Sequence, residues 1–198
     1  MELCTNPIIH ASGFTPTRSL YVPTLVLIPP SLLVYNSILC PEVLRLYAAF
    51  EDREHYYLVQ ELVTGGDLYS RTARGRYVSE SLLVQEVIYP LLLALYRLHH
   101  RRYVHRDIKP ENIYFDQMDR IKLGEFGHAI DATRHKPVSK VGTLEFMAPE
   151  VLDVERHARG GYPAPASRLT KLPREHRRGY GPRADIWSLG VTLVRTIP

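Results

Sequence analysis

The hydrophobic and polar positions divide the first half of the chain into short apolar runs followed by one long apolar segment. Val43–Phe50 and Tyr56–Gln60 are short apolar runs separated by a polar turn. Runs of this length predict two adjacent strands. From Ser79, apolar residues follow helical spacing as far as Leu98, which predicts a long buried helix with Ser79 as its N-cap. Pro90 interrupts this helix, and we expect a kink or a break there.

A hairpin and a second helix are expected further along. The apolar runs 113–115 and 120–123 flank the polar turn Asp116–Asp119, a pattern that predicts two antiparallel strands. Residues 184–194 return to helical spacing and predict another helix. The intervening residues 153–183 are rich in proline, glycine and basic residues, so we expect a mobile loop there.

Charge and cysteine content narrow the class of protein. The 198 residues fit one domain and carry a net charge of +4. Residues 156–183 contain eight Lys or Arg and one Glu, so this segment contributes +7 and the rest of the chain −3. Because the basicity is confined to one segment, no nucleic-acid partner is expected. Cys4 and Cys40 are too few for a disulfide scaffold, which favours an intracellular location, cytoplasmic or nuclear.

The uncharged segment Ser19–Pro41 is long enough to span a bilayer. Its prolines, Pro23, Pro29 and Pro30, remove helical donors and clash with the preceding turn, and unsatisfied backbone groups are costly in lipid. No membrane partner is therefore expected. The first 18 residues lack a basic start followed directly by an apolar run, so no cleaved signal is expected either.

A polar segment with candidate chemistry follows the long helix: His105-Arg106-Asp107-Ile108-Lys109-Pro110-Glu111-Asn112. An alcohol that attacks a phosphoryl group needs an acceptor for its proton, which Asp107 supplies, and Lys109 can neutralise charge on the moving group. Asn112 offers an uncharged oxygen ligand to Mg²⁺. The spacing of these three side chains favours phosphoryl transfer from ATP.

The same eight residues resemble the catalytic loop of the eukaryotic protein kinases, and a lysine two residues after the aspartate is the form of the serine/threonine branch. The resemblance implies an α+β, protein-kinase-like fold, with a mostly helical C-terminal lobe and remnant strands of the N-terminal lobe. It covers residues 40–198 as a partial kinase domain with a basic insertion at about 153–183. Residues 1–39 look like a non-kinase or replaced segment.

Gly124-Glu125-Phe126-Gly127 departs from the family, which has Asp-Phe-Gly at this place. That aspartate chelates the Mg²⁺ that bridges the nucleotide phosphates, so the resemblance places Glu125 in a metal site with Asn112. The extra methylene of Glu125 displaces the carboxylate by about 1 Å, and such a misplacement costs on the order of 10²-fold in rate.

Gly142–Glu150 resembles the end of a kinase activation segment. By this resemblance, Thr143 hydrogen-bonds near Asp107 and Lys109 and helps to seat a Ser or Thr acceptor. Asp185 would accept backbone hydrogen bonds from the catalytic loop and hold it rigid. The alternative for Asp185 is an ordinary N-cap of the helix that follows.

The segment between Glu125 and Glu150 is long enough to act as a switch. The resemblance suggests that Arg106, beside the catalytic aspartate, binds a phosphate carried by this segment. A phosphate on Ser139 or Thr133 would give Arg106 a bidentate partner and order the loop, although exposed hydroxyls in loops are usually only solvated.

The strand Tyr56–Gln60 and the residues after it resemble the hinge whose backbone groups bind adenine. By this resemblance, the Glu61 carbonyl and the Val63 amide and carbonyl bind the base, and Asp67 reaches the ribose hydroxyls. Tyr114 would lie under the adenine ring, where a phenol can stack. The alternative for the apolar residues among them is plain core.

Three parts of an active kinase have no counterpart: the Gly-rich phosphate loop, the strand lysine and the helix glutamate. Met1–Leu39 holds one glycine, and the first lysine of the chain is Lys109. We therefore expect a domain truncated at both ends. Its complete form would transfer the γ-phosphoryl group of MgATP to Ser or Thr hydroxyls of a protein substrate. The alternative, favoured by Glu125 and the missing lysine, is a pseudokinase or interaction module. No oligomeric state is indicated.

Overall fold

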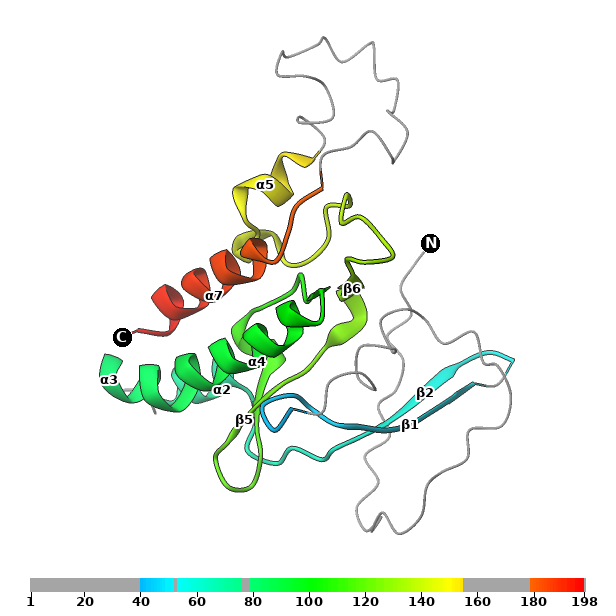
Figure 1. Cartoon of the computed structure of the whole chain (residues 1–198). Coiled ribbons are helices and arrows are strands. Elements are labelled where there is room, and N and C mark those ends of the chain that lie inside the picture. The colour runs from blue at the N-terminus through cyan, green and yellow to red at the C-terminus, as the bar shows by residue number, and fades with distance from the viewer. Residues whose placement is uncertain (1–39, 52, 76–78, 155–178, 198) are drawn as a thin grey trace.

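The computed structural model describes residues 40–51, 53–75, 79–154 and 179–197. Strands β1 (Leu46–Glu51) and β2 (Tyr56–Gln60) pair antiparallel and form a long ribbon at one side of Figure 1. The two predicted strands are confirmed, although β1 begins later than the apolar run. The segment 1–39 and residues 155–178 of the expected loop lie outside the described residues.

The predicted long helix runs from Glu80 to His100 without a break. It consists of α3 (Glu80–Leu83), a π-helical turn, η1 (Val84–Ile88), and α4 (Tyr89–His100). Ser79 caps it as predicted, since its side chain accepts a hydrogen bond of 3.3 Å from the amide of Leu82. Pro90 has no N–H and its ring crowds the carbonyl four residues earlier, so the helix widens into the π turn before Pro90.

This helix forms the centre of the main hydrophobic core. Its 21 residues include a window of mean hydropathy 1.4, so length and composition alone would allow it to cross a membrane. The central helix of a globular core passes the same test, and here the apolar side chains of one face are fully buried: Leu83, Val87, Leu91, Ala94, Leu95 and Leu98. They pack against apolar residues of segment 113–123 and of the last helix, which fixes those elements around one core.

Short strands and helical turns contain most residues of the candidate site. Strands β4 (Ile113–Phe115) and β5 (Ile121–Leu123) form the predicted hairpin, and β3 (Tyr103–Val104) pairs with β6 (Ile130–Asp131). The remaining short elements are α2 (Leu68–Ala73), η2 (Pro110–Asn112), η3 (Phe126–His128), η4 (Leu144–Phe146) and α5 (Pro149–Leu152).

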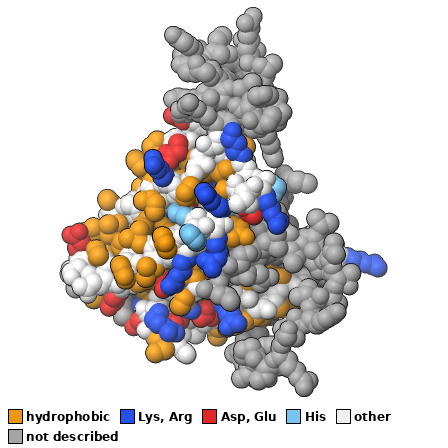
Figure 2. All heavy atoms as spheres, in the orientation of Figure 1, with side chains coloured by type: hydrophobic (Ala, Val, Ile, Leu, Met, Phe, Trp, Pro, Cys, Tyr) orange, Lys and Arg blue, Asp and Glu red, His pale blue; other side chains and the backbone are white. Residues whose placement is uncertain are grey.

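The last helix, α7 (Arg183–Thr196), lies beside α4 in Figure 1. It begins two residues before Asp185, with Pro182 at its N-cap, so the N-cap alternative for Asp185 is wrong. Its start packs with α5 in a second, smaller core of Ala148, Val151, Val154, Tyr180 and Ala184. We find that α4 and α7 also expose apolar side chains, and Figure 2 shows hydrophobic atoms gathered where these helices lie.

Candidate functional site

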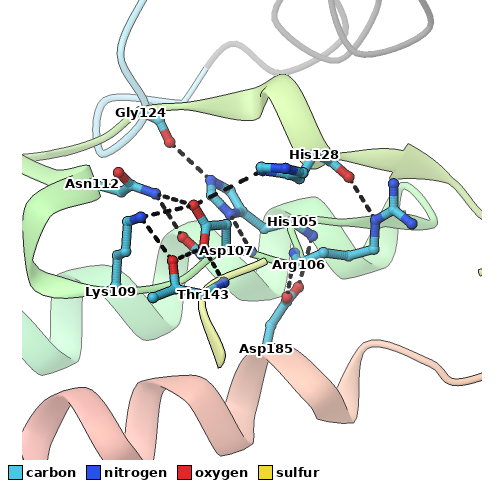
Figure 3. A network of polar contacts seen from close by, with 9 residues as sticks. All are labelled: His105, Arg106, Asp107, Lys109, Asn112, Gly124, His128, Thr143 and Asp185. Atoms are coloured by element: carbon cyan, nitrogen blue, oxygen red, sulfur yellow. Dashed lines mark hydrogen bonds and ion pairs between the residues drawn. The ribbon is translucent and has the colours of Figure 1, made fainter. Parts of the chain in front are cut away.

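The carboxylate of Asp107 is the centre of a network of polar contacts (Figure 3). Its Oδ1 accepts hydrogen bonds from the amide and the hydroxyl of Thr143, at 2.9 and 2.8 Å. Its Oδ2 accepts a bond of 2.9 Å from Nδ2 of Asn112 and lies 3.3 Å from Nζ of Lys109. The loop between β3 and β4 thus brings three of the predicted side chains together, and a fourth arrives from the segment before η4.

Thr143 shows what this arrangement can bind. Its hydroxyl donates to Asp107 and at the same time accepts a hydrogen bond of 2.8 Å from Nζ of Lys109. One alcohol oxygen is therefore held between a carboxylate, which can take a proton, and an ammonium group, which can stabilise negative charge. The predicted contacts of Thr143 are confirmed, while its role in seating an acceptor stays a prediction.

Donors around Asp107 hold it in the ionised form. Burial alone would raise the pKa of this carboxyl group, but hydrogen bonds from Thr143 and Asn112 and the charge of Lys109 outweigh burial and lower the pKa below its ordinary value. An ionised carboxylate accepts hydrogen bonds only. Asp107 is therefore suited to orient a hydroxyl group.

Asp185 fixes the backbone of the loop His105–Asn112. Its side chain is fully buried and accepts from the amides of His105 and Arg106, at 2.9 and 2.8 Å. His99 Nε2 lies 2.8 Å from the same carboxylate. The predicted backbone contacts of Asp185 are confirmed. They matter because Arg106 has a φ of 72°, in the left-handed region that a side chain disfavours.

His105 connects the loop to β5. Its ring is fully buried, its Nε2 lies 2.8 Å from the Gly124 carbonyl, and the Asp107 amide donates to its Nδ1 at 3.3 Å. Burial lowers the pKa of His105, which keeps the imidazole neutral. A neutral ring with the proton on Nε2 satisfies both contacts, and it contacts Phe126 edge-on at 4.8 Å.

The residues predicted as a switch already have hydrogen-bond partners in the chain. Arg106 donates from Nε to the His128 carbonyl at 2.5 Å and from Nη1 to the Tyr180 hydroxyl at 3.4 Å. Ser139 is half-buried, and its carbonyl accepts from the Tyr180 hydroxyl. The Thr133 hydroxyl donates to Asp131 at 2.6 Å. Whether Ser139 or Thr133 carries a phosphate stays a prediction.

The predicted hinge has contacts that sequence patterns did not indicate. The Glu61 amide donates to the Arg45 carbonyl, and the Glu61 carboxylate forms an ion pair of 2.8 Å with Lys122 of β5. Among the residues that the structure describes, the backbone of Val63 has no backbone hydrogen-bond partner. Asp67 caps α2, because its side chain accepts from the amide of Ser70 at 2.7 Å. Contact with a nucleotide stays a prediction for all three hinge residues.

Tyr114 lies against the bare Cα of Gly124. A Cβ at position 124 would come within 2.7 Å of the Tyr114 ring, so the phenol takes the space of a side chain there. Burial, followed by the negative charges of Glu125 and Asp67, raises the pKa of Tyr114 to about 12. The hydroxyl therefore stays protonated, and contact of the ring with adenine stays a prediction.

We expect Gly124→Ala to lower the free energy of unfolding by about 1–3 kcal/mol, because the new methyl group overlaps the Tyr114 ring. In a Tyr114→Leu background, the same change should cost much less, with a coupling of about 1 kcal/mol or more in a urea-unfolding double-mutant cycle. Gly190→Ala is the matched control, since a Cβ there meets no atom within 4 Å. Additive effects at positions 114 and 124 would contradict this packing.

The oxygen donors at the site suit a hard cation such as Mg²⁺. Asn112 uses its Nδ2 on the carbonyl and carboxylate of Asp107, and Figure 3 shows its oxygen on the side away from Asp107. Glu125 is exposed and adopts left-handed backbone angles, φ 55° and ψ 61°. Within the described part of the chain, no group of three or more His, Cys, Asp or Glu side chains is placed to hold a metal ion. A cation here would need further ligands from a nucleotide or water, and the metal role of Asn112 and Glu125 stays a prediction.

Comparison with known proteins agrees with this geometry. The family model for the protein kinase domain matches residues 31–197. Citron rho-interacting kinase of Rattus norvegicus is 39% identical over 154 residues, which cover 76% of this chain and 7% of that protein. Serine/threonine-protein kinase MRCK gamma of Mus musculus is 34% identical over 152 residues, covering 75% of this chain and 9% of that protein.

A shorter relative gives the same result. Aurora kinase of Schizosaccharomyces pombe is 32% identical over 149 residues, which cover 75% of this chain and 35% of that protein. The chain thus spans a tenth or less of the citron and MRCK relatives. Both the family model and these identities extend over most of the chain. It belongs to the eukaryotic protein kinase family, in the serine/threonine branch.

Proposed function

We propose that this chain supplies the acceptor side of a serine/threonine protein kinase, which transfers the γ-phosphoryl group of MgATP to a Ser or Thr hydroxyl of a protein. The single observation that carries the proposal is the hydroxyl of Thr143, which is bound by Asp107 and Lys109 together. A substrate hydroxyl bound beside that of Thr143 would donate to the same carboxylate and lie near the same ammonium group. These are the two contacts that an attacking alcohol requires.

Each residue predicted to act in catalysis, metal binding or nucleotide binding has a role in this proposal. Asp107 orients the acceptor hydroxyl and takes its proton, and Lys109 stabilises the charge on the transferred group. Bound MgATP supplies that group, with Asn112 and Glu125 as candidate ligands of the metal ion. The remaining predicted residues would hold the nucleotide and the acceptor: Glu61, Val63, Asp67 and Tyr114 for the former, and Thr143 for the latter.

The relatives are kinases by name, which favours a transferase over the pseudokinase or interaction module. The test is incubation of the chain with γ-labelled MgATP and a basic protein, followed by identification of the labelled amino acid. We expect label on serine and threonine, and an increase of the melting temperature with MgATP. Absence of both turnover and the melting shift would overturn the proposal.

Glu125→Asp should raise the transfer rate by up to about 10²-fold, because the shorter side chain returns the carboxylate to the metal position of the family. It should also lower the Mg²⁺ concentration needed for half-maximal rate. Aspartate tolerates the left-handed backbone at this position better than glutamate, so the melting temperature should not fall. The measurement is the initial rate of transfer over a series of Mg²⁺ concentrations.

Glu80→Asp is the matched control, because it makes the same change at an exposed helix start. It should leave both the rate and the Mg²⁺ dependence as they are. If Glu125→Asp gave no gain in rate, the inference that Glu125 misplaces the metal ion would be wrong, while the proposed reaction would stand on the activity of the unmodified chain.

A further inference from the structure

Gly179 and Tyr180 contact residues 136–139, in the middle of the segment between Glu125 and Glu150, which is called the activation segment below. The Tyr180 amide donates to the Pro137 carbonyl at 3.0 Å, and the Tyr180 hydroxyl donates to the Ser139 carbonyl at 2.8 Å. The contact is close, since a Cβ on Gly179 would lie 2.9 Å from the Lys136 side chain. Two backbone carbonyls of the segment are therefore held by one residue that is more than forty positions away in the sequence.

The same phenol oxygen also contacts the catalytic loop. Arg106 donates to it from Nη1 at 3.4 Å, while its Nε is bound to the His128 carbonyl. A tyrosine hydroxyl has one donor, which the Ser139 carbonyl takes, and its oxygen can accept as well. Tyr180 thus joins the activation segment to the residue next to Asp107.

The ring of Tyr180 has little freedom to move. The residue is 7% exposed and packs in the smaller core with Val151 of α5 and Ala184 of α7. Burial raises the pKa of its hydroxyl, which therefore remains a donor. A side chain that is fixed by packing can hold a loop in place through a hydrogen bond.

The hydrogen bond at Ser139 lies only four residues before Thr143, which contacts Asp107. Gly142 has a φ of 110°, and a Cβ there would lie 2.3 Å from the Arg106 carbonyl oxygen. Only glycine can therefore occupy this position without a clash. Thr143 then places its amide and hydroxyl on Asp107. The segment from 139 to 143 is held at both ends, by Tyr180 and by Asp107.

We propose that Tyr180 is a positioning residue, which acts through Ser139 and Arg106 to keep Thr143 on Asp107. The contact uses the backbone carbonyl of Ser139, so it needs neither the serine hydroxyl nor a phosphate. The hydrogen bonds of Tyr180 thus order the segment in the unmodified chain. The inference concerns the arrangement of the segment and rests on the proposed function only where turnover is measured.

The test is hydrogen–deuterium exchange of the whole chain with Tyr180→Phe, which keeps the ring in its core and removes the hydroxyl. Loss of one such hydrogen bond should speed exchange of the Thr143 amide and its neighbours by about fivefold. Exchange in α4 should not change. Tyr96→Phe, at a phenol that is 68% exposed, and Ser139→Ala are matched controls and should leave the Thr143 amide as protected as before.

The proposal is overturned if Tyr180→Phe leaves the exchange of Thr143 unchanged, or if it speeds exchange equally in α4, which would indicate a general loss of stability. It is also overturned if Ser139→Ala has the same effect as Tyr180→Phe. Where the chain transfers phosphate, Tyr180→Phe should lower kcat by a similar factor of about five and leave the KM for ATP unchanged. A chain without turnover would contradict the proposed function, and the exchange experiment would still decide the role of Tyr180.

Discussion

Asp107→Asn should lower the rate of phosphoryl transfer by about 10²- to 10⁴-fold, the usual contribution of a positioned acid or base. An amide cannot take the proton of the acceptor hydroxyl. It also puts an NH₂ group in place of one of the two oxygens, which face Thr143 on one side and Asn112 and Lys109 on the other. The measurement is the initial rate with saturating MgATP and a fixed acceptor protein. The melting shift with MgATP should be retained, because the predicted nucleotide contacts are made by other residues.

Asp116→Asn is the matched control for this prediction. Asp116 is buried, like Asp107, and accepts from the Met118 and Arg120 amides and from the Arg120 side chain in the β4–β5 turn. Local hydrogen bonds outweigh its burial and lower its pKa too. The change should therefore cost stability without removing a group that touches the acceptor. Equal loss of rate in both variants would mean that the effect at Asp107 is a loss of folding.

The low pKa of Asp107 bears on how it would act. A weakly basic carboxylate does not remove a proton from an alcohol in the ground state. Its contribution must come from orienting the hydroxyl and from accepting the proton late, when the oxygen is already bound to phosphorus and has become acidic. Lys109, whose ammonium group donates to the Thr143 hydroxyl at 2.8 Å, would serve the same end by stabilising negative charge near that point.

The local elements of this fold could be predicted from the sequence because their signals are local. Ser79 marks the start of the long helix by its own side chain, and apolar runs on both sides of a polar turn mark the β4–β5 hairpin. The type of deformation at Pro90 could not be predicted, since a kink and a π turn can each accommodate a residue that has no N–H. The grouping of side chains around Asp107 could be predicted from the family resemblance. The motifs of a family specify the spacing of particular residue types, which hydrophobic periodicity does not.

Other long-range contacts, which the family resemblance did not indicate, had no signal in the sequence pattern either. Tyr180 reaches Ser139 across 41 positions and Arg106 across 74, and nothing near Gly179-Tyr180-Gly181 indicates such partners. The ion pair of Lys122 with Glu61 joins β5 to the residue after β2, 61 positions away, and Lys122 lies in a run that predicts only a strand. A pairing of this kind depends on tertiary packing, which short-range patterns do not encode.

The left-handed backbone of Arg106 explains why the loop needs a buried anchor. A non-glycine residue in this region costs about 1–3 kcal/mol, and it persists only where surrounding contacts hold it. Asp185 provides these contacts from α7, and Gly142 fits against the carbonyl that the turn presents. The geometry around Asp107 therefore depends on α7 as much as on the loop itself.

Asp185→Ala should lower the free energy of unfolding by about 3–5 kcal/mol, because it leaves buried donors of His105, Arg106 and His99 without their acceptor. That is a large part of the 5–15 kcal/mol that typically holds a domain folded. The measurements are urea unfolding and exchange of the His105 and Arg106 amides. Asp185→Asn keeps one acceptor oxygen and the shape of the side chain, so it should lose less and remain folded if the alanine variant does not.

The control for this prediction is Asp131→Ala, at an aspartate whose hydrogen bonds from the Thr133 amide and hydroxyl are local. It should cost about 1 kcal/mol, the usual net value of such a bond, and leave exchange at Arg106 unchanged. In Asp185→Asn, the Arg106 amide should exchange much faster, and transfer of phosphate should fall with it, because the left-handed turn then lacks the contact that holds it. If that amide stayed protected, Arg106 would owe its conformation to the loop alone, and α7 would have no part in shaping the site.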